Sequence, residues 1–356
     1  MTEEIVKPLM EWYEKNHRIL PWRESKNPYY IWISEIMLQQ TRVEAVKPYF
    51  ERFIRALPTV EAVAVCSEEQ LLKLWEGLGY YNRVRNIQKA AVSVMERYDG
   101  KLPADYHKLL ELPGIGSYTA GAVASIAYDI PVPAVDGNVL RVISRITEND
   151  EDILKQSVKT QVEKELGEIM PTEQPGIFNQ ALMELGALVC IPPNGMAKCE
   201  ICPVAKICRA YAHGTVSQLP VKKKSKERRL EKKTVLVIRD GDKVAIRKRP
   251  ARGLLAGMYE LPNLEGHLSE EQILEWIEEY QILPLQIHRL ENSRHIFSHV
   301  EWEMTGYVIR VAELDIKKEK DLLFVETADV EKQYPVPTAF HAYAVYMNMK
   351  LGPEKG

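Results

Sequence analysis

The spacing of apolar residues changes once along this 356-residue chain, and the change limits the folds it can adopt. Up to about residue 220, apolar residues recur every three or four positions, which is typical of amphipathic helices. This period is clearest in residues 31–53, 71–78, 84–95 and 153–166. From residue 234, short β-branched runs replace it. Because the chain is also longer than one core usually supports, we predict an all-α domain at residues 1–220 and a smaller α+β domain at residues 234–350.

A basic segment, residues 221–233 (VKKKSKERRLEKK), separates the two predicted domains. It holds eight lysines and arginines and almost nothing apolar, which favours a solvated linker. The same charges also suit a segment that follows DNA phosphates, and both interpretations can hold.

The second domain carries three local signals of mixed structure. An Asp-Gly pair at residues 240–241, flanked by β-branched runs, predicts a β-hairpin. Ser269 and Gln272 form a capping box for a helix that runs to Tyr280. Residues 302–311 follow with a strand-like pattern.

Composition narrows the function less than it narrows the fold. The formal net charge is −3, so the overall charge neither supports nor excludes nucleic-acid binding. The first 17 residues lack the apolar core of a signal peptide, and no apolar run reaches membrane-spanning length. We therefore expect a cytoplasmic protein, associated with the nucleoid if the source is bacterial, and no membrane partner.

Four of the five cysteines lie within nineteen residues, separated by gaps of eight, two and five residues. They are Cys190, Cys199, Cys202 and Cys208. In a cytosolic chain this density favours a metal site over disulfides. The spacing alone leaves a [4Fe–4S] cluster and a four-cysteine zinc site open. We expect the fifth cysteine, Cys66, to be a buried core residue.

Residues 112–116 (LPGIG) precede an apolar run at residues 118–127. Two glycines at this spacing allow a tight turn between helices and let a phosphate approach backbone N–H groups at a helix start. A Gly-x-Gly pair alone is usually only a turn. The whole element predicts a hairpin that grips DNA without reading its sequence.

Two carboxylates stand in apolar surroundings. Asp136 precedes a predicted helix, so it suits a simple N-cap as well as a functional acid. Glu35, within the apolar residues 31–38, is expected at the start of a helix, where a carboxylate also complements the helix dipole. The functional interpretation is that burial keeps Glu35 protonated, while Asp136 stabilises positive charge. Cleavage of a glycosidic bond needs this division of roles.

Together these motifs resemble the endonuclease III branch of the helix-hairpin-helix DNA glycosylases. Within that branch the chain resembles the MutY-type adenine DNA glycosylases, through residues 18–23 (RILPWR), 35–41 (EIMLQQT) and 77–81 (GLGYY). The resemblance implies a helix-hairpin-helix glycosylase domain with a [4Fe–4S] loop at residues 190–208. It also implies base flipping and removal of adenine opposite 8-oxoguanine or guanine in double-stranded DNA, by a monomer.

The resemblance also assigns roles to particular residues. The implied catalytic group, in which Glu35 protonates adenine and Asp136 stabilises the sugar cation, is Glu35, Asp136, Tyr118 and Asn138. The implied adenine pocket is Leu20, Trp22, Arg23 and Gln180. The implied DNA-binding and intercalating residues are Gln40, Thr41, Tyr80, Leu112, Gly114 and Gly116. The implied cluster ligands are Cys190, Cys199, Cys202 and Cys208.

The chain departs from the family pattern at two places. Where the bifunctional relatives carry a Schiff-base lysine, this chain has Tyr118, and a phenol cannot form an imine. We therefore expect a monofunctional glycosylase with little or no AP-lyase activity. The first cysteine gap is eight residues where the family normally has six, which puts the loading of the cluster in question.

The second domain resembles the Nudix-like domain of the same proteins. By this resemblance, Phe297, Ser298 and His299 form the loop that reads 8-oxoguanine, although the tripeptide also suits a half-buried strand edge. Residues 275–279 (EWIEE) have only the core of a Nudix metal-binding box, so we expect these glutamates on the wet face of a helix. Two alternatives remain open: a Nudix pyrophosphohydrolase of oxidised nucleotides, and a non-catalytic Fe–S protein that binds DNA.

Overall fold

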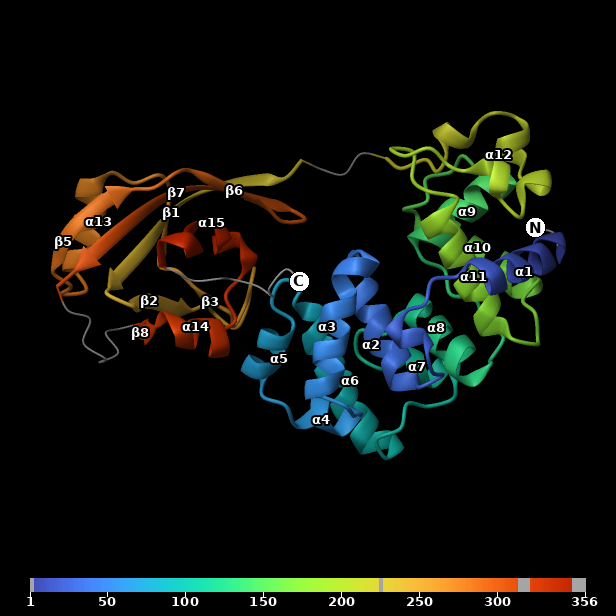
Figure 1. Cartoon of the computed structure of the whole chain (residues 1–356), viewed down its shortest axis with the longest axis horizontal. Coiled ribbons are helices and arrows are strands. Elements are labelled where there is room, and N and C mark those ends of the chain that lie inside the picture. Colours follow the sequence, from blue (N-terminus) through green and yellow to red (C-terminus); the bar gives the residue numbers. More distant parts are fainter. Residues whose placement is uncertain (1–2, 224–226, 313–320, 348–356) are drawn as a thin grey trace. The chain divides into compact units, whose positions relative to one another are not determined.

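The computed structural model describes residues 3–223, 227–312 and 321–347. The chain divides into two compact units, Met1–Val65 with Arg85–Lys224, and Cys66–Val84 with Ser225–Gly356 (Figure 1). Residues 224–226 of the predicted linker, and residues 313–320 and 348–350 of the predicted second domain, lie outside the described part. No helix in the described part is long and apolar enough to cross a membrane.

In its described residues, the first unit is built from helices. They are α1 (Val6–Asn16), α2 (Pro28–Leu38), α3 (Val43–Ala56), α4 (Val60–Val65), α6 (Asn82–Tyr98, whose first residues belong to the second unit), α7 (Tyr106–Leu110), α8 (Ser117–Tyr128), α9 (Gly137–Thr147), α10 (Gln156–Glu168), α11 (Pro175–Leu188) and α12 (Arg209–Ala212). Helices α2 and α8 pack together and are buried on nearly all sides, as expected for helices that are apolar all round. A methyl group at Gly121 of α8 would lie 2.2 Å from the carbonyl oxygen of Pro133, so glycine lets the segment before α9 pack directly on α8.

The apolar period of residues 31–53 is divided between two helices. α2 ends at Leu38, α3 begins at Val43, and Gln40 between them has a φ of 60°, which breaks the helix. The expectation that Glu35 lies at a helix start is wrong, because α2 begins at Pro28. Asn27 caps it by accepting a hydrogen bond from the Tyr29 N–H, and Pro28 suits the first helical position. Glu35 therefore lies in the C-terminal half of α2.

The predicted turn between two helices at residues 112–116 is confirmed. It joins α7 to α8, and Gly114 has a φ of 75°. A methyl group at Gly114 would lie 2.6 Å from Asn86 Cβ, so this glycine is required by the fold. Gly116 has a φ of −95°, and a methyl group there would meet no heavy atom of the described residues within 4 Å. The fold does not explain Gly116.

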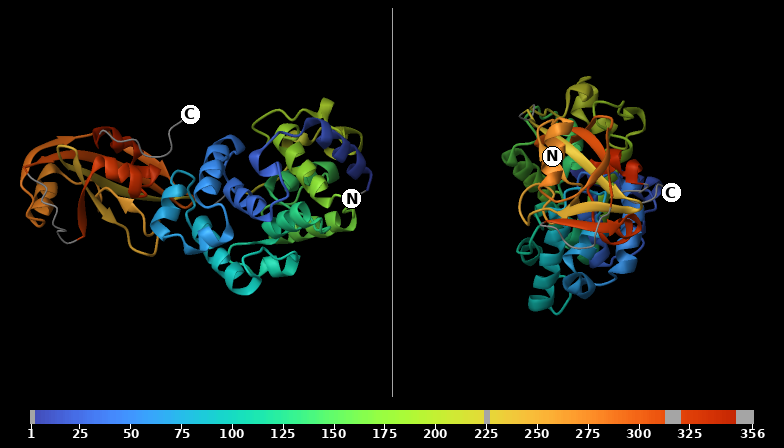
Figure 2. Two further views of the ribbon diagram at one scale, coloured as in Figure 1. Left: turned by 60° about the horizontal axis from the view of Figure 1, so that its bottom comes forward. Right: turned by 90° about the vertical axis from the view of Figure 1, so that its left-hand side faces the viewer.

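The second unit contains an eight-stranded mixed sheet within its described residues. Its elements are α5 (Glu68–Leu74), β1 (Arg229–Asp240), β2 (Lys243–Lys248), β3 (Tyr259–Glu260), β4 (Asn263–Glu265), α13 (Glu270–Glu278), β5 (Pro284–Arg289), β6 (Ser293–Ile296), β7 (Val300–Val311), β8 (Leu322–Glu326), α14 (Thr327–Gln333) and α15 (His341–Ala344). The main strand order is β3-β2-β1-β7-β5, with β4 on β1, β6 on β7 and β8 on β2. The long parallel pairing of β1 with β7 forms its centre; Figure 2 gives two further views.

Alternate residues of the strands enter two different cores. Val235 and Val237 of β1 pack with α14 and α15 on one face, whereas Leu236 and Ile238 pack with α13 on the other. The sheet is therefore covered by helices on both faces. Gly306 of β7 lets Tyr343 of α15 approach the sheet, because a methyl group there would lie 2.2 Å from the ring.

The local signals of this unit are confirmed, with shifted ends. Asp240 pairs with Lys243 across the predicted hairpin turn. The Ser269–Gln272 capping box is present, but α13 ends at Glu278, before Tyr280. β1 begins at Arg229, within the predicted linker, because its pairing with β7 continues outward to Val300. Helix α5 ends at Leu74, within the period of residues 71–78, since the glycines at 77 and 79 adopt positive φ.

Candidate active site

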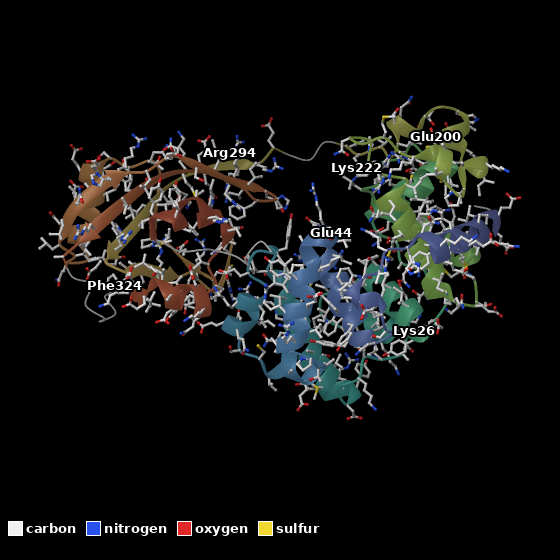
Figure 3. All side chains as sticks on the ribbon, in the orientation of Figure 1. Lys26, Glu44, Glu200, Lys222, Arg294 and Phe324 are labelled. Carbon is white, nitrogen blue, oxygen red and sulfur yellow. The ribbon has the colours of Figure 1, made fainter. Side chains whose placement is uncertain are left out.

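A cleft of about 770 Å³ opens in the first unit where α2, α8, α9 and α11 meet. It brings together Leu20, Trp22, Arg23, Glu35, Gln40, Thr41, Tyr118, Asp136, Asn138 and Gln180. These are all the predicted catalytic and adenine-pocket residues, with two of the predicted DNA-binding residues. Its lining also includes Lys159 and Lys222, the latter labelled in Figure 3. The predicted catalytic and adenine-pocket residues therefore share one cleft.

Glu35 is held out of water in this cleft. Its exposed fraction is 6%, and Tyr118, the second residue of α8, donates its phenol O–H to the Glu35 carboxylate. Burial raises the pKa of Glu35 to about 7, against the opposing effects of Tyr118 and Arg23. Burial also raises the pKa of Tyr118 well above 10, so the phenol remains a donor at neutral pH. Glu35 can therefore carry a proton near neutral pH.

Asp136 caps the N-terminus of α9, so the N-cap interpretation is confirmed and is compatible with a functional role. The carboxylate accepts hydrogen bonds from the Val139 N–H and the Asn138 amide, each at 2.8 Å. Burial raises the pKa of Asp136, and these hydrogen bonds oppose that rise. The carboxylate thus has fixed donors that favour its ionised form.

The two carboxyl groups lie at opposite ends of their helices. Asp136 lies at the positive end of the α9 dipole, which favours a negative charge there. Glu35 lies near the negative end of α2, which disfavours one. Such an end effect is worth about 0.3–1 kcal/mol. The backbone therefore disfavours ionisation of Glu35 and favours ionisation of Asp136.

Asn138 is fixed by Arg141, a residue that sequence reasoning did not select. The Arg141 guanidinium donates to the Asn138 side-chain oxygen at 2.9 Å, and also to the backbone carbonyls of Gly186 and Cys190, each at 2.8 Å. A methyl group at Gly186 would lie 2.7 Å from Asn138 Cβ. The amide that contacts Asp136 is thus held from α11 and from the start of the cysteine loop.

The segment that leads into Asp136 is held by Asn179 of α11, which is fully buried. Its side-chain oxygen accepts from the Ala134 N–H at 3.0 Å, and its nitrogen donates to the carbonyl of Val132 at 2.9 Å and to Ser125 at 2.8 Å. A segment without helical or strand hydrogen bonds needs such side-chain partners when it is buried. Asn179 therefore sets where α9, and with it Asp136, begins.

A buried ion cluster forms a second wall of the cleft. Glu184 of α11 is fully buried and accepts from the Nε of Arg18 at 2.6 Å and from Arg23 at 2.9 Å. Burial raises the pKa of Glu184, but Arg18 and Arg23 outweigh it, so the net shift is downward. Glu184 stays ionised and orients both guanidinium groups at the cleft.

The remaining pocket residues are positioned more simply. Trp22 is buried and meets Phe50 edge to face, with ring centroids 5.4 Å apart, so it supports the wall. The Gln180 side-chain oxygen accepts from the Tyr13 O–H at 3.0 Å, and its nitrogen donates to the Gly176 carbonyl at 3.2 Å. These two bonds use one lone pair and one N–H of Gln180, whose amide can still accept one hydrogen bond and donate another.

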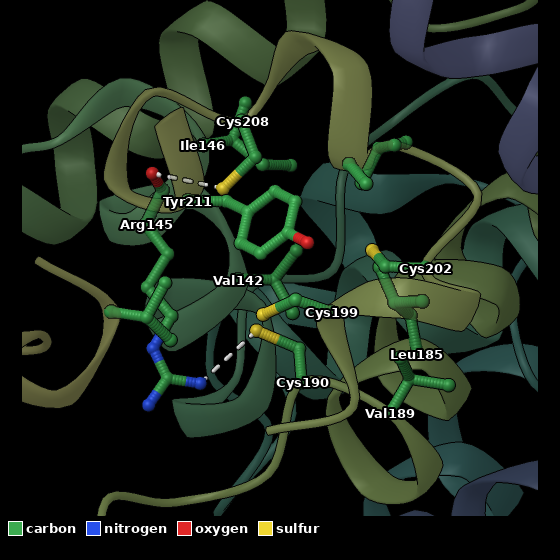
Figure 4. A pocket seen from close by; sticks show the side chains of 13 residues that line it. Val142, Arg145, Ile146, Leu185, Val189, Cys190, Cys199, Cys202, Cys208 and Tyr211 are labelled. Carbon is green, nitrogen blue, oxygen red and sulfur yellow. Dashed lines mark hydrogen bonds between the residues drawn. The ribbon is translucent and has the colours of Figure 1, made fainter. Parts of the chain in front are cut away.

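Four cysteines of the first unit line a separate small cavity (Figure 4). They are Cys190, Cys199, Cys202 and Cys208. Apolar side chains of α9 and α11 form much of its wall, and the buried Arg145 donates to Cys190 Sγ at 3.2 Å. Within residues 3–223, 227–312 and 321–347, no three His, Cys, Asp or Glu side chains meet closely enough to hold a single metal ion.

The other predicted residues lie outside the cleft. Phe297, Ser298 and His299 form the tip of the hairpin between β6 and β7 in the second unit, not a strand edge. Phe297 packs on Trp302, with ring centroids 4.9 Å apart, whereas Ser298 and His299 are exposed. Tyr80 belongs to the same unit, and the Ser298 hydroxyl donates to its phenol oxygen at 3.1 Å. Leu112, Gly114 and Gly116 lie in the hairpin of the first unit.

Comparison with known proteins identifies the family. Residues 33–171 match the HhH-GPD superfamily base excision DNA repair proteins, and residues 234–344 match the NUDIX domain. An adenine DNA glycosylase of Buchnera aphidicola subsp. Baizongia pistaciae (strain Bp) is 35% identical over 299 residues, which cover 82% of each chain. The adenine DNA glycosylase of Schizosaccharomyces pombe is 31% identical and covers 93% of this chain and 86% of its own.

The chain belongs to the adenine DNA glycosylase family. Its first unit also matches the fold of a non-covalent endonuclease III–DNA complex, with a TM-score of 0.51 and 26% identity over 60% of this chain and 98% of that one. The resemblance to MutY-type glycosylases and the two-part fold class predicted from the sequence are thereby confirmed.

Sequence reasoning missed three buried residues: Arg141 and Glu184, which line this cleft, and Asn179, which supports it from behind. Each of them forms hydrogen bonds with residues that are distant in the chain. Glu184, for example, binds Arg18, which lies 166 positions away. The one local signal was a polar side chain on the apolar face of a strongly apolar helix, as with Asn179 and Glu184 in α11. Such a residue must have a partner when it is buried.

Replacement of Glu184 by alanine tests the buried ion cluster. Because the change leaves Arg18 and Arg23 without their carboxylate, we expect the free energy of unfolding to fall by about 3 kcal/mol or more. Chemical denaturation with two spectroscopic probes measures it. As a control, Glu151→Ala removes only an exposed ion pair with Lys155 and should change stability by at most about 0.5 kcal/mol. Equal effects of the two variants would contradict the role assigned to Glu184.

Proposed function

We propose that this protein is a monofunctional, monomeric adenine DNA glycosylase that removes adenine mispaired with 8-oxoguanine or guanine in double-stranded DNA. The observation that carries the proposal is the pair of carboxyl groups in one cleft. Glu35 has a pKa of about 7 and lies at the negative end of α2, whereas Asp136 is surrounded by donors at the positive end of α9. Glycosidic cleavage needs one carboxyl group of each kind.

The chemistry follows from these two environments. An adenine flipped from the duplex would enter the cleft, and extrusion costs least at a mismatch. Glu35, oriented by Tyr118, would donate its proton to N7 of the base and so make adenine a better leaving group. Asp136, fixed by Asn138, would stabilise the positive charge that develops on the sugar until water attacks it.

Other residues of the cleft would bind the base. The free N–H and lone pair of Gln180 suit the N6/N7 edge of adenine, which an amide can bind through two hydrogen bonds. Arg23 stays next to Glu184, so its planar guanidinium reaches the cleft in a fixed orientation. Leu20 and Trp22 form the apolar wall.

The DNA would be held by backbone groups and inserted side chains. Gly116 is the N-cap of α8 and provides no side-chain cap for the first N–H groups of the helix, and its open surroundings leave room for a phosphate. Gln40 and Tyr80 both have positive φ, at 60° and 49°, a conformation that costs energy for residues other than glycine. We assign these two to insertion into the base stack, with Thr41 beside Gln40.

The second unit would read the base opposite the adenine. The tip of the β6–β7 hairpin presents Ser298 and His299 to solvent, while Phe297 anchors the tip on Trp302. The alternative Nudix hydrolase activity gains no support from α13, because its glutamates are exposed while Ile273 and Ile277 face the core.

We assign the four-cysteine cavity to a [4Fe–4S] cluster. Four thiols around one apolar-walled cavity suit such a cluster, and the buried Arg145 would offset the net negative charge of a cluster bound by four thiolates. When bound, it would cross-link residues 190–208. The long first gap is a loop that leaves the cavity lined by all four cysteines. Iron and sulfide analysis of the purified chain should give about four of each per molecule; one zinc ion instead would contradict the assignment.

A single-turnover assay tests the catalytic proposal. The substrate is a duplex with one central 8-oxoguanine:A pair, and strand breaks are read with and without hot alkali. Wild type should release adenine and leave an alkali-labile site with little breakage beforehand, since Tyr118 cannot form an imine. Glu35→Gln should lose about 10²–10⁴-fold in rate, and Asp136→Asn about 10²–10³-fold, while both still bind DNA.

Glu44→Gln serves as the matched control. Glu44 is an exposed carboxylate of α3, and the hydrogen bonds described for its side chain come from Lys47. It should keep the wild-type rate. Tight binding by wild type without release of adenine would show that the protein is a lesion binder or acts on another base.

A further inference from the structure

Helix α5 and the turn after it pack within the second unit, although they precede that unit's sheet by about 150 residues in sequence. Glu69, Lys73 and Glu76 follow one another at spacings of four and three residues, so they share one face of the helix and its continuation. All three side chains contact residues of the C-terminal part of the chain.

Lys73 caps the C-terminal end of α14. Its ammonium group donates to the backbone carbonyls of Tyr334 at 3.0 Å and Val330 at 3.3 Å, and it forms an ion pair with Glu76 at 2.7 Å. A cation at the last carbonyls of a helix satisfies them and suits the helix dipole. The side chain is mostly buried, with 19% exposed.

Glu76 completes this arrangement. Its exposed fraction is 5%, and its other carboxylate oxygen accepts the Val336 N–H at 2.8 Å. A buried carboxylate that holds an ammonium and a backbone N–H fixes both elements, because the loss of either partner leaves a buried polar group unsatisfied. Glu69, by contrast, is half exposed in its contacts with Lys248 and Tyr259, where an ion pair contributes little.

The turn that follows Glu76 carries Tyr80 and is braced from inside. Trp75 donates to the carbonyl of Gly79 at 3.1 Å, and Arg83 donates to those of Leu78 and Gly79 at 3.0 and 3.1 Å. The Arg83 guanidinium also lies over the rings of Trp75 and Tyr80, at 5.2 and 5.6 Å. The turn is therefore stiff, and its position follows from where its first residues are anchored.

Tyr80 at the end of this turn meets the exposed hairpin tip through Ser298, at 3.1 Å. The Tyr80 turn, assigned above to insertion into the base stack, and residues 297–299, assigned to reading the opposite base, are thus neighbours within one unit. The Lys73–Glu76 pair anchors the first of them to α14 and to residues 334–336, which pack against the sheet that carries the second.

We propose that Lys73 and Glu76 are positioning residues that set the preference for 8-oxoguanine:A over G:A pairs. The inference rests on the proposed function, which supplies the two substrates. 8-Oxoguanine differs from guanine by one carbonyl oxygen and one N–H, so it is distinguished only by groups held in place to a fraction of an ångström. The Lys73–Glu76 anchor holds the Tyr80 turn in register with the hairpin tip.

The test compares full-length wild type with Lys73→Met, Glu76→Ala and Glu76→Gln. Single-turnover rates are measured on 8-oxoguanine:A and G:A duplexes, and dissociation constants on the same duplexes with an uncleavable 2′-fluoro-adenosine. Lys73→Met and Glu76→Ala should lower the ratio of the two affinities by about tenfold, and the rate at saturating enzyme should change less than about threefold. Glu76→Gln keeps the acceptor for the Val336 N–H and should recover part of the ratio.

Glu69→Gln is the matched control on the same helix face, and it should leave the ratio unchanged because the Glu69 carboxylate is half exposed. Thermal denaturation reports whether each variant is folded; if Glu76→Ala is not, Lys73→Met still decides the outcome. The proposal is overturned if Lys73→Met keeps the wild-type ratio within about twofold, or if both duplexes weaken equally, which is the mark of a purely structural role. If wild type releases no adenine, or shows no preference between the two duplexes, the proposed function itself is refuted. Wild type is therefore assayed before any variant is made.

Discussion

The exclusion of water from one carboxyl group, that of Glu35, is the constraint on which the rest of the active-site cleft depends. α2 and α8 are apolar on nearly every side, and their packing leaves Glu35 with the Tyr118 phenol as a neighbour in place of solvent. Burial shifts the pKa of Glu35 from 4.5 to about 7. In the unfolded chain, Glu35 ionises at its ordinary, lower pKa. Its burial therefore lowers the free energy of unfolding as the pH rises from about 4.5 to about 7. A group that costs stability in this way is typical of a functional site.

The second carboxyl group is placed by connections that span the first unit. Asn179 fixes the segment before α9, Asp136 caps α9, and Asn138 holds the Asp136 carboxylate. Arg141 links Asn138 to the carbonyl of Cys190, where the cysteine loop begins. The geometry of Asp136 therefore depends on the folding of residues far from it, and the cysteine loop is part of the support of the cleft.

Local physical signals predicted a large part of the fold. The change of apolar period, the Asp240 turn and the Ser269 capping box each act within a few residues, and each is present. The start of α2 at Asn27 and Pro28 was also visible in the sequence, but the apolar run beginning at Ile31 obscured it. The break at Gln40 could not be predicted, because no glycine, proline, asparagine or aspartate marks it; Gln40 takes a positive φ in a loop that lines the cleft.

The candidate site was predictable only as far as its motifs reach. Glu35, Tyr118 and Asp136 stand in recognisable segments, and the cleft unites them. Glu184 looks like an ordinary helix glutamate, and only its partnership with Arg18 and Arg23 makes it part of the wall. In the same way, nothing in residues 66–84 indicates that Lys73 and Glu76 pack with residues about 260 positions later. Such contacts depend on burial, which is a property of the whole fold.

The pH dependence of adenine release tests most directly the claim that Glu35 acts as a buried acid tuned by Tyr118. Single-turnover rates at saturating enzyme should fall above an apparent pKa near 7 in wild type, since a deprotonated Glu35 cannot protonate the base. In Tyr118→Phe this falling limb should move to higher pH, because the hydrogen bond from Tyr118 lowers the pKa of Glu35. A wild-type rate that stays constant between about pH 5 and 9, or a limb that moves to lower pH in the variant, would contradict the account.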